Sequence, residues 1–388
     1  MNNLVAKILR HKTIRAFWQI LSFIVTLPLY YLGYLIPKNS SIWVFGNFFG
    51  FKDNARYLFE YVLKFHPGIE PVWICNQGKL QPTGGRNYSC YSLVGIWYQY
   101  RAAIAFVSTG QGDLARFTLA RTKIVQLWHG IPIKHILLDS PETLPFQNKN
   151  SFLYYVSRKF FQKNLNRYSV IIASSKAVQH RMISAFGLPE QKISITGYPR
   201  NDIIYENSNI IKKKILYAPT WRDNISDAYT IIKAICNQKF ISEIKKSGYV
   251  LMVSIHPLNK QLEELLEPVS NIIQFTHDQD INYILAQSEI LITDYSSIAI
   301  DFAPLNRKII FYTPDIDKYF QGRGIYKEFE TIIKTHGLTE YAEVLTEIST
   351  KTDNRVILPD TFFHYNDAGS RKRIVEMVKK LLPANQNR

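Results

Sequence analysis

The chain has 388 residues, of which 46% are hydrophobic and 20% charged, a composition typical of a globular protein with two or three domains. Its three cysteines, Cys75, Cys90 and Cys236, are too few and too scattered for a disulfide framework or a four-ligand zinc site. The net charge of +16 indicates a polyanionic partner or a membrane surface.

The excess positive charge lies entirely in the first half of the chain. Residues 1–38 hold five Lys and Arg and no acid, residues 71–189 hold fourteen against three acids, and residues 190–388 hold twenty-five of each. Lipid headgroups, a phosphate-rich substrate or nucleic acid would each suit this distribution, as would a basic surface without a special function. The sequence has no basic-aromatic stacking motif and no helix-turn-helix, so nucleic acid is not expected as a partner.

The first element along the chain is an uncharged, aromatic-rich stretch from Ala16 to Pro37. It is long enough to span a bilayer, and the basic residues before it would then keep the N-terminus in the cytoplasm. It does not resemble a signal peptide, because no small-residue cleavage site follows it. Tyr and Trp prefer the headgroup region, so we favour an interfacial helix broken near Pro28 over a span, with a buried helix as the third interpretation. We take residues 1–40 as this membrane-associating segment.

After this segment, short apolar runs alternate with helical patterns, which is typical of parallel sheets covered by helices. The predicted strands are Ser41–Phe45, Val72–Cys75, Ile104–Ser108, Ile124–Leu127 and Val170–Ala173 in the first half, and Ile215–Tyr217, Val250–Ile255, Ile272–Phe275, Ile290–Thr293 and Lys308–Tyr312 in the second.

The turn-rich stretch Thr196–Asp202 and the polar segment after it place a domain boundary near 200–212. We therefore predict an α/β protein with one domain over 41–205 and another over 206–388. The last helix, over Asp367–Leu382, is amphipathic and could cross back to the first domain. Two open α/β domains should bind a ligand in the cleft between them, outside the carboxyl ends of the strands.

Two histidines stand at the ends of predicted strands. His129 comes two residues after Leu127 and directly before a glycine, and His256 ends an apolar run and precedes Pro257. An open α/β sheet places its functional groups at such ends, where an imidazole can accept a proton near neutral pH. With one histidine in each domain, the two could face each other. A packed histidine beside Trp128 explains the spacing of His129 equally well.

Three further loops could hold phosphate. Ser296 and Ser297 follow Asp294 and open a predicted helix whose N–H groups suit an anion, although a plain helix cap is the commoner use of such residues. Arg222 could hold phosphate oxygens bidentately or form a surface pair with Asp. Asp280 belongs to an acidic pair like those that hold a metal in some nucleotide-sugar enzymes, but its place before a predicted helix favours capping. The sequence has no Walker A motif, no GxGxxG and no His/Cys cluster, so we expect no metal.

Together these segments resemble the CDP-glycerol glycerophosphotransferase family of teichoic-acid and capsule polymer synthesis, over residues 41 to 375. The family pattern Trp-His-Gly-Thr-Pro-Leu-Lys is matched except at Ile131 and Ile133. The motifs that carry the resemblance are Trp43–Asn47 with Asp53 and Asn54, Trp128–Lys134, Thr196–Asp202, Leu216–Asn224, His256 with Pro257, Ile292–Ser297, and Asp367–Ser370 with Arg373.

The resemblance implies a GT-B-like pair of Rossmann-type domains, peripheral monotopic attachment to the cytoplasmic face of the bacterial cell membrane, and transfer without a metal or other cofactor. It implies that His129 is the general base on the acceptor hydroxyl and that His256 stabilises the phosphates of the donor. The other residues carried over are Arg222, Asp280, Asp294, Ser296 and Ser297 for donor binding, and Lys134 and Asn54 on the acceptor side.

In the implied reaction, an acceptor hydroxyl attacks the β-phosphorus of CDP-glycerol and CMP leaves, a transfer that needs mainly positioning and charge stabilisation. The acceptor is a lipid-linked or polymeric glycan, and an anionic membrane surface would account for the basic first half. A CDP-ribitol or nucleotide-sugar donor on the same fold is the nearest alternative. A non-catalytic, membrane-attached polyanion-binding protein is the alternative from another class.

Overall fold

The computed structural model describes residues 25–75, 82, 84–146, 148–256, 259, 261–266, 273–276, 279–322, 324–350, 356, 358 and 360–383. These residues form two compact units, each built on its own parallel sheet. The first unit holds the described residues up to His129, Ile136–Pro199 and those from Gly369 on. The second holds Gly130–His135 and Arg200–Ala368. The prediction of two parallel-sheet α/β domains is confirmed.

The sheet of the first unit has seven strands among the described residues, all parallel, in the order β3-β2-β1-β4-β5-β6-β7. The strands are β1 (Asn39–Gly46), β2 (Glu70–Cys75), β3 (Arg86–Ser89), β4 (Ala102–Val107), β5 (Lys123–Gln126), β6 (Tyr168–Ala173) and β7 (Ile193–Ile195). The helices of this unit are α3 (Asp53–Phe65), α4 (Leu93–Arg101), α5 (Phe152–Leu165), α6 (Lys176–Phe186) and α16 (Ser370–Lys379).

The sheet of the second unit has six parallel strands among the described residues, in the order β10-β9-β8-β11-β12-β13. They are β8 (Lys212–Ala218), β9 (Val250–Val253), β10 (Ile273–Phe275), β11 (Ser288–Thr293), β12 (Lys308–Tyr312) and β13 (Gly337–Leu338). The helices are α7 (Pro199–Glu206), α8 (Ile225–Ile235), α9 (Gln238–Lys246), α10 (Gln261–Leu265), α11 (Ile281–Gln287), α12 (Ile298–Phe302), α13 (Ile316–Gly322), α14 (Lys327–His336) and α15 (Tyr341–Ser349).

The central strands are apolar because helices cover both faces of each sheet. Every residue of β4 is buried, and Phe106 on this strand stacks on Phe45 of β1 with ring centroids 4.6 Å apart. In the second unit, apolar side chains of α8, α9 and α15 form one buried cluster with those of β8 and β9. Burial of this kind is the main free energy that stabilises each unit.

Both sheets reverse their strand order after the first strand, between β1 and β4 and between β8 and β11. Loops at the carboxyl ends of the strands beside such a reversal form the usual ligand site of a doubly wound sheet. All of the predicted histidine, serine and arginine site residues lie in loops that follow β5, β8, β9 and β11.

The strands missing from the prediction are β3, β7 and β13, which are all short edge strands. An edge strand pairs on one side only and is less buried, so β3 carries the polar sequence Arg-Asn-Tyr-Ser instead of an apolar run. The prediction over Val250–Ile255 was too long, because β9 ends at Val253.

The aromatic N-terminal stretch lies partly outside the described residues, which start at Val25. The break expected near Pro28 is wrong: residues 25–32 form one helix that runs through Pro28. This helix docks on the first unit, where the Leu29 carbonyl accepts a hydrogen bond from the Tyr100 hydroxyl (2.8 Å) and Arg121 donates to the Tyr34 carbonyl (3.1 Å). Within the part of the chain that is described, no helix has the length and apolar character needed to cross a membrane.

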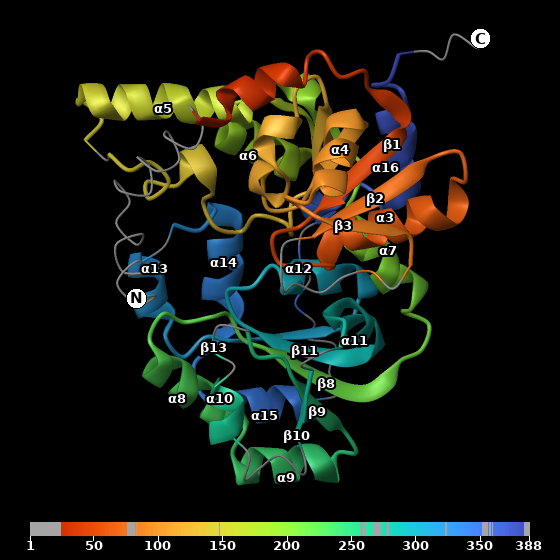
Figure 1. Cartoon of the computed structure of the whole chain (residues 1–388). Helices are drawn as coiled ribbons and strands as arrows, with labels where there is room; N and C mark the ends of the chain where they lie inside the picture. Colours follow the sequence, from red (N-terminus) through yellow and green to blue (C-terminus); the bar gives the residue numbers. More distant parts are fainter. Residues whose placement is uncertain are drawn as a thin grey trace. The chain divides into compact units, whose positions relative to one another are not determined.

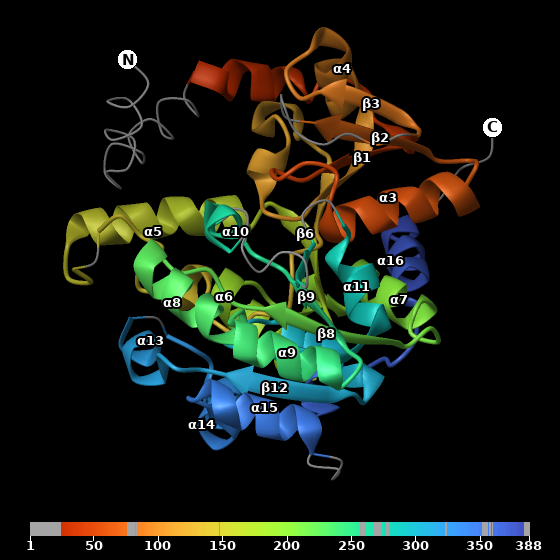
Figure 2. The same ribbon diagram turned by 90° about the horizontal axis from the view of Figure 1, so that it is seen from below.

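The last helix packs in the first unit. It was predicted over Asp367–Leu382, and α16 covers the central part of that range with Ile374, Val375 and Val378 buried. It contacts α3, and the two helices lie side by side in both views (Figures 1 and 2). The chain therefore returns to its first unit after completing the second.

Candidate active site

His129 is exposed at the end of a tightly constrained loop. Trp128, which precedes it, is buried and has a φ of +53°, a conformation that costs a non-glycine residue about 1–3 kcal/mol. The backbone N–H of Trp128 donates to the side-chain oxygen of Gln126 (3.0 Å), and the indole stacks on the imidazole with centroids 4.5 Å apart. The histidine thus packs beside Trp128, as the simpler interpretation expects, and is still presented to solvent.

Asn54 supports the same loop from helix α3. It is completely buried, and its Nδ2 donates to the carbonyl oxygens of Leu127 (3.1 Å) and Trp128 (2.9 Å). These two bonds use both amide hydrogens of the side chain. Asn54, predicted on the acceptor side, is therefore placed to hold the His129 loop in shape.

The imidazole of His129 has a defined orientation. Its Nδ1 lies 3.3 Å from the carbonyl oxygen of Ser108, at the end of β4. A carbonyl oxygen can only accept, so this contact requires the hydrogen on Nδ1 and leaves the lone pair of the neutral ring on Nε2. A general base needs a lone pair held in a fixed direction.

Gly130, the residue after His129, belongs to the second unit and has a φ of +149°. A Cβ at this position would lie 2.8 Å from Nη2 of Arg200 and 3.1 Å from Oγ of Ser297. Arg200 is itself buried and forms an ion pair with Asp301. The glycine of the His-Gly motif is required by both its backbone conformation and its close neighbours.

Lys134 also lies in the second unit, although it was predicted on the acceptor side. Its backbone forms an antiparallel bridge with Ile325, and its Nζ lies 5.2 Å from the centre of the Tyr319 ring. Its contacts are therefore with α13 and the segment before α14.

Arg222 is the centre of a buried ion-pair network. Its guanidinium donates to Asp294 Oδ2 (2.9 Å) and to both carboxylate oxygens of Asp315 (2.8 and 3.1 Å). It also donates to the carbonyl oxygen of Thr220 (2.6 Å). Burial alone would lower the pKa of Arg222, but the charges of Asp294 and Asp315 outweigh burial and raise it. Arg222 thus pairs with aspartates, which is one of the two interpretations of the sequence, but the pair is buried and not on the surface.

The same network joins three strand-end loops. Asp294, after β11, accepts the backbone N–H of Thr220, after β8 (2.8 Å). The Tyr295 hydroxyl donates to Asp315, after β12 (3.1 Å), and the Tyr295 ring stacks on Tyr319 at 3.7 Å. Arg222 and Asp294, predicted as donor-binding residues, thus hold these loops together. Asp315 was not predicted as a site residue, because it lies 93 positions from Arg222 and in no recognised motif.

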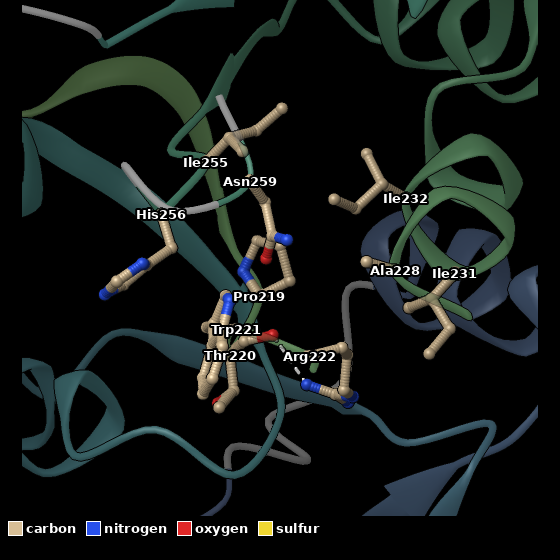
Figure 3. Close-up of a pocket in the computed structure, with 10 residues that line it drawn as sticks. All are labelled: Pro219, Thr220, Trp221, Arg222, Ala228, Ile231, Ile232, Ile255, His256 and Asn259. Carbon is tan, nitrogen blue, oxygen red and sulfur yellow. Dashed lines mark hydrogen bonds between the residues drawn. The ribbon is translucent and has the colours of Figure 1, made fainter. Parts of the chain in front are cut away.

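His256 lies on the rim of a small pocket in the second unit (Figure 3). Its ring is beside Trp221, at a centroid distance of 6.2 Å, and across the pocket from Ala228, Ile231 and Ile232 of α8. The residue is exposed, yet the protein around the ring displaces enough water to lower its pKa below the ordinary value. At neutral pH the imidazole is therefore uncharged and can donate one hydrogen bond.

The remaining predicted residues lie at two helix starts. Ser296 and Ser297 are half-buried just before α12, which is only five residues long. Asp280 caps α11 by accepting the N–H of Asn282 (3.1 Å), so the capping interpretation is confirmed. Asp278, the other member of the acidic pair, lies outside the described residues.

Among the residues that the structure does describe, no three His, Cys, Asp or Glu side chains are grouped as metal ligands.

The chain matches known proteins over most of its length. Residues 29–380 match the family model of CDP-glycerol:poly(glycerophosphate) glycerophosphotransferases. A teichoic acid poly(glycerol phosphate) polymerase of Bacillus spizizenii is 30% identical over 88% of this chain and 93% of its own. A teichoic acid glycerol-phosphate transferase of Staphylococcus aureus is 26% identical over 88% of this chain and 94% of its own.

Two kinds of solved structure share the fold. The wall teichoic acid polymerase TagF superposes with a TM-score of 0.73 at 22% identity, over 94% of this chain and 97% of that one. The UDP-GlcNAc 2-epimerase of Methanocaldococcus jannaschii gives 0.52 at 11% identity, over 87% and 99%. The chain therefore belongs to the CDP-glycerol:poly(glycerophosphate) glycerophosphotransferase family, as its motifs predict, and is a transferase of that family.

Proposed function

We propose that this protein transfers glycerol phosphate from CDP-glycerol to a hydroxyl group of a lipid-linked or polymeric glycan and releases CMP. The observation that carries the proposal is the exposed imidazole of His129, whose Nδ1 contact with Ser108 places the lone pair of the neutral ring on Nε2. Family membership and the names of the relatives support CDP-glycerol as the donor. A TagF structure soaked with CDPG supports it further.

In this mechanism, His129 removes the proton as the acceptor oxygen attacks the β-phosphorus and CMP leaves. The second unit holds the donor: His256 donates to the phosphates, and Ser296 and Ser297 with nearby N–H groups bind the pyrophosphate. Arg222 and Asp294, together with Asp315, hold the loops of this site in place. The basic first unit receives the anionic acceptor. No metal is required, because positioning and fixed dipoles stabilise the transferred phosphoryl group.

The donor is tested by incubating the purified protein with CDP-glycerol or CDP-ribitol, with and without a lipid-linked acceptor, and measuring CMP. We expect acceptor-dependent release from CDP-glycerol and at least tenfold slower release from CDP-ribitol. Faster release from CDP-ribitol would change the assigned donor. Binding of heparin without CMP release from either nucleotide would favour the non-catalytic polyanion-binding alternative.

Donor affinity should depend on pH through His256. Because the pKa of the imidazole is lowered in the free protein, the ring gains a proton and a positive charge only in acid. The charged ring attracts a pyrophosphate more strongly, so CDP-glycerol should bind more tightly as the pH falls through 6.5 and below. Calorimetric titration between pH 5.5 and 8 would measure this trend. The trend should vanish in His256→Gln, and its persistence there would show that another group is responsible.

Peripheral attachment to an anionic membrane is supported by the exposed apolar and aromatic side chains of residues 25–35. These are Val25, Leu29, Tyr31, Leu32, Tyr34 and Leu35. Leu35 is 79% exposed, and burying such a side chain contributes about 1.5–3 kcal/mol.

Flotation with vesicles tests this attachment. Vesicles that contain phosphatidylglycerol should retain the protein, and Leu35→Glu should weaken retention about tenfold or more. Leu265→Glu, at an exposed leucine of the second unit, is the matched control. Equal retention of all three proteins would place the membrane contact elsewhere.

A further inference from the structure

The peptide group between Ser108 and Thr109 connects His129 to a buried carboxylate. Its carbonyl oxygen accepts from His129 Nδ1 (3.3 Å), and its N–H donates to Oδ2 of Asp113 (2.8 Å). Two hydrogen bonds therefore connect the Asp113 carboxylate, through one peptide, to the His129 imidazole. All of them belong to the first unit.

Five hydrogen-bond donors hold the carboxylate of Asp113 in the loop that follows β4. Its carboxylate accepts the backbone N–H groups of Phe48 (3.0 Å), Ser108 (2.8 Å), Thr109 and Gly110 (3.3 Å), and the Thr109 hydroxyl. The residue is completely buried. Its pKa is raised, because burial outweighs the hydrogen bonds that would lower it. The four backbone N–H groups can only donate, and the ionised carboxylate offers acceptors to all four and to the Thr109 hydroxyl.

The sequence around Asp113 is otherwise basic. Residues 71–189 carry only two other acids, Asp139 and Glu142, against fourteen Lys and Arg. Asp139 is half-buried at the end of a short 3-10 helix and Glu142 is exposed on a turn, whereas Asp113 lies where the ends of β1 and β4 meet, beside the reversal of strand order. Asp113 is thus the one completely buried acid of the three, and it is connected to the candidate base His129 through one peptide.

We propose that Asp113 is a positioning residue for His129, acting through the 108–109 peptide. The carboxylate polarises this peptide, which makes the Ser108 carbonyl a stronger acceptor, as hydrogen bonds in series strengthen one another. The stronger acceptor holds the hydrogen on Nδ1 and stabilises the imidazolium that forms when Nε2 takes the acceptor proton. A serine-hydrolase triad achieves the same effect by direct contact between carboxylate and imidazole. This inference rests on the proposed role of His129.

The first test is kinetic. Asp113→Asn should lower kcat roughly 10–100-fold, as happens in metal sites when the hydrogen-bond partner that orients a histidine is removed. The KM for CDP-glycerol should stay unchanged. In a His129→Ala background, the same substitution should cause no further loss, because Asp113 acts only through the ring. Asp139→Asn is the matched control in the first unit and should leave kcat unchanged. Equal losses from Asp113→Asn in both backgrounds would overturn the proposal.

The second test does not depend on turnover or on the stability of a variant. Nitrogen NMR of histidine-labelled wild-type protein should show neutral His129 with its hydrogen on Nδ1. A hydrogen on Nε2 would overturn the proposal even if Asp113→Asn does not fold. Near-normal turnover of His129→Ala would remove the proposed base, but the NMR result would still test whether the hydrogen is held on Nδ1, as the proposal requires.

Discussion

Replacing His129 with alanine should reduce CMP release about 10²–10⁴-fold, the usual contribution of a single general base. The loss should appear in kcat, since the donor is proposed to bind the second unit and His129 is proposed as the base on the acceptor hydroxyl. The fold should survive, because the imidazole is exposed and the strained Trp128 turn keeps its own contacts with Gln126 and Asn54. Steady-state CMP release together with thermal unfolding would measure both expectations.

The control is His180→Ala, which removes an exposed histidine from α6 of the same unit. It should leave CMP release and the unfolding temperature close to those of the wild type. Near-normal turnover of His129→Ala with an intact fold would exclude His129 as the base. An unfolded variant would show that the ring matters for packing against Trp128.

Replacing Arg222 with alanine should cost the second unit about 3–5 kcal/mol of unfolding free energy. The substitution leaves Asp294 and Asp315 facing each other in a buried site without a cation, and their side chains are only 2% and 18% exposed. Arg222→Lys should recover only part of the loss, because one ammonium cannot form the paired contacts that the planar guanidinium makes with Asp315. Urea unfolding followed by circular dichroism would measure these changes.

Lys246→Ala is the matched control, since it removes a cation from an exposed ion pair with Glu243. Exposed pairs contribute little, so the unfolding free energy should change by about 0.5 kcal/mol or less. A loss of donor binding in Arg222→Ala with unchanged stability would mean that the guanidinium contacts phosphate directly.

The strands that could be predicted are those whose burial is reflected directly in a local run of apolar residues. Central strand β4 is a continuous apolar run, and β1 is one from Ile42 to Gly46, because both faces of these stretches are covered. The polar strand β3 and the two-residue strand β13 give no such signal. Their positions depend on neighbours that are distant in the sequence.

In the candidate site, too, the residues that could be predicted are those that stand in a local sequence pattern. His129 could be recognised from the end of β5 and the glycine after it, and from the family motif. Asp113 could not, because Gly-Gln-Gly-Asp resembles an ordinary turn and its partners come from two strand ends. Asp315 was missed for the same reason: an ion pair across 93 positions leaves no local pattern.

The return of α16 to the first unit has a consequence for how the protein is made. The helix that packs on α3 leaves the ribosome only after the whole second unit. At about 5–20 residues per second, roughly 10–40 s pass between synthesis of Pro199 and that of α16. During this interval the part of α3 that contacts α16 lacks that partner, so the first unit is completed only after the second. Proteolysis of ribosome-bound chains arrested before Gly369 would detect this delay as cleavage in α3.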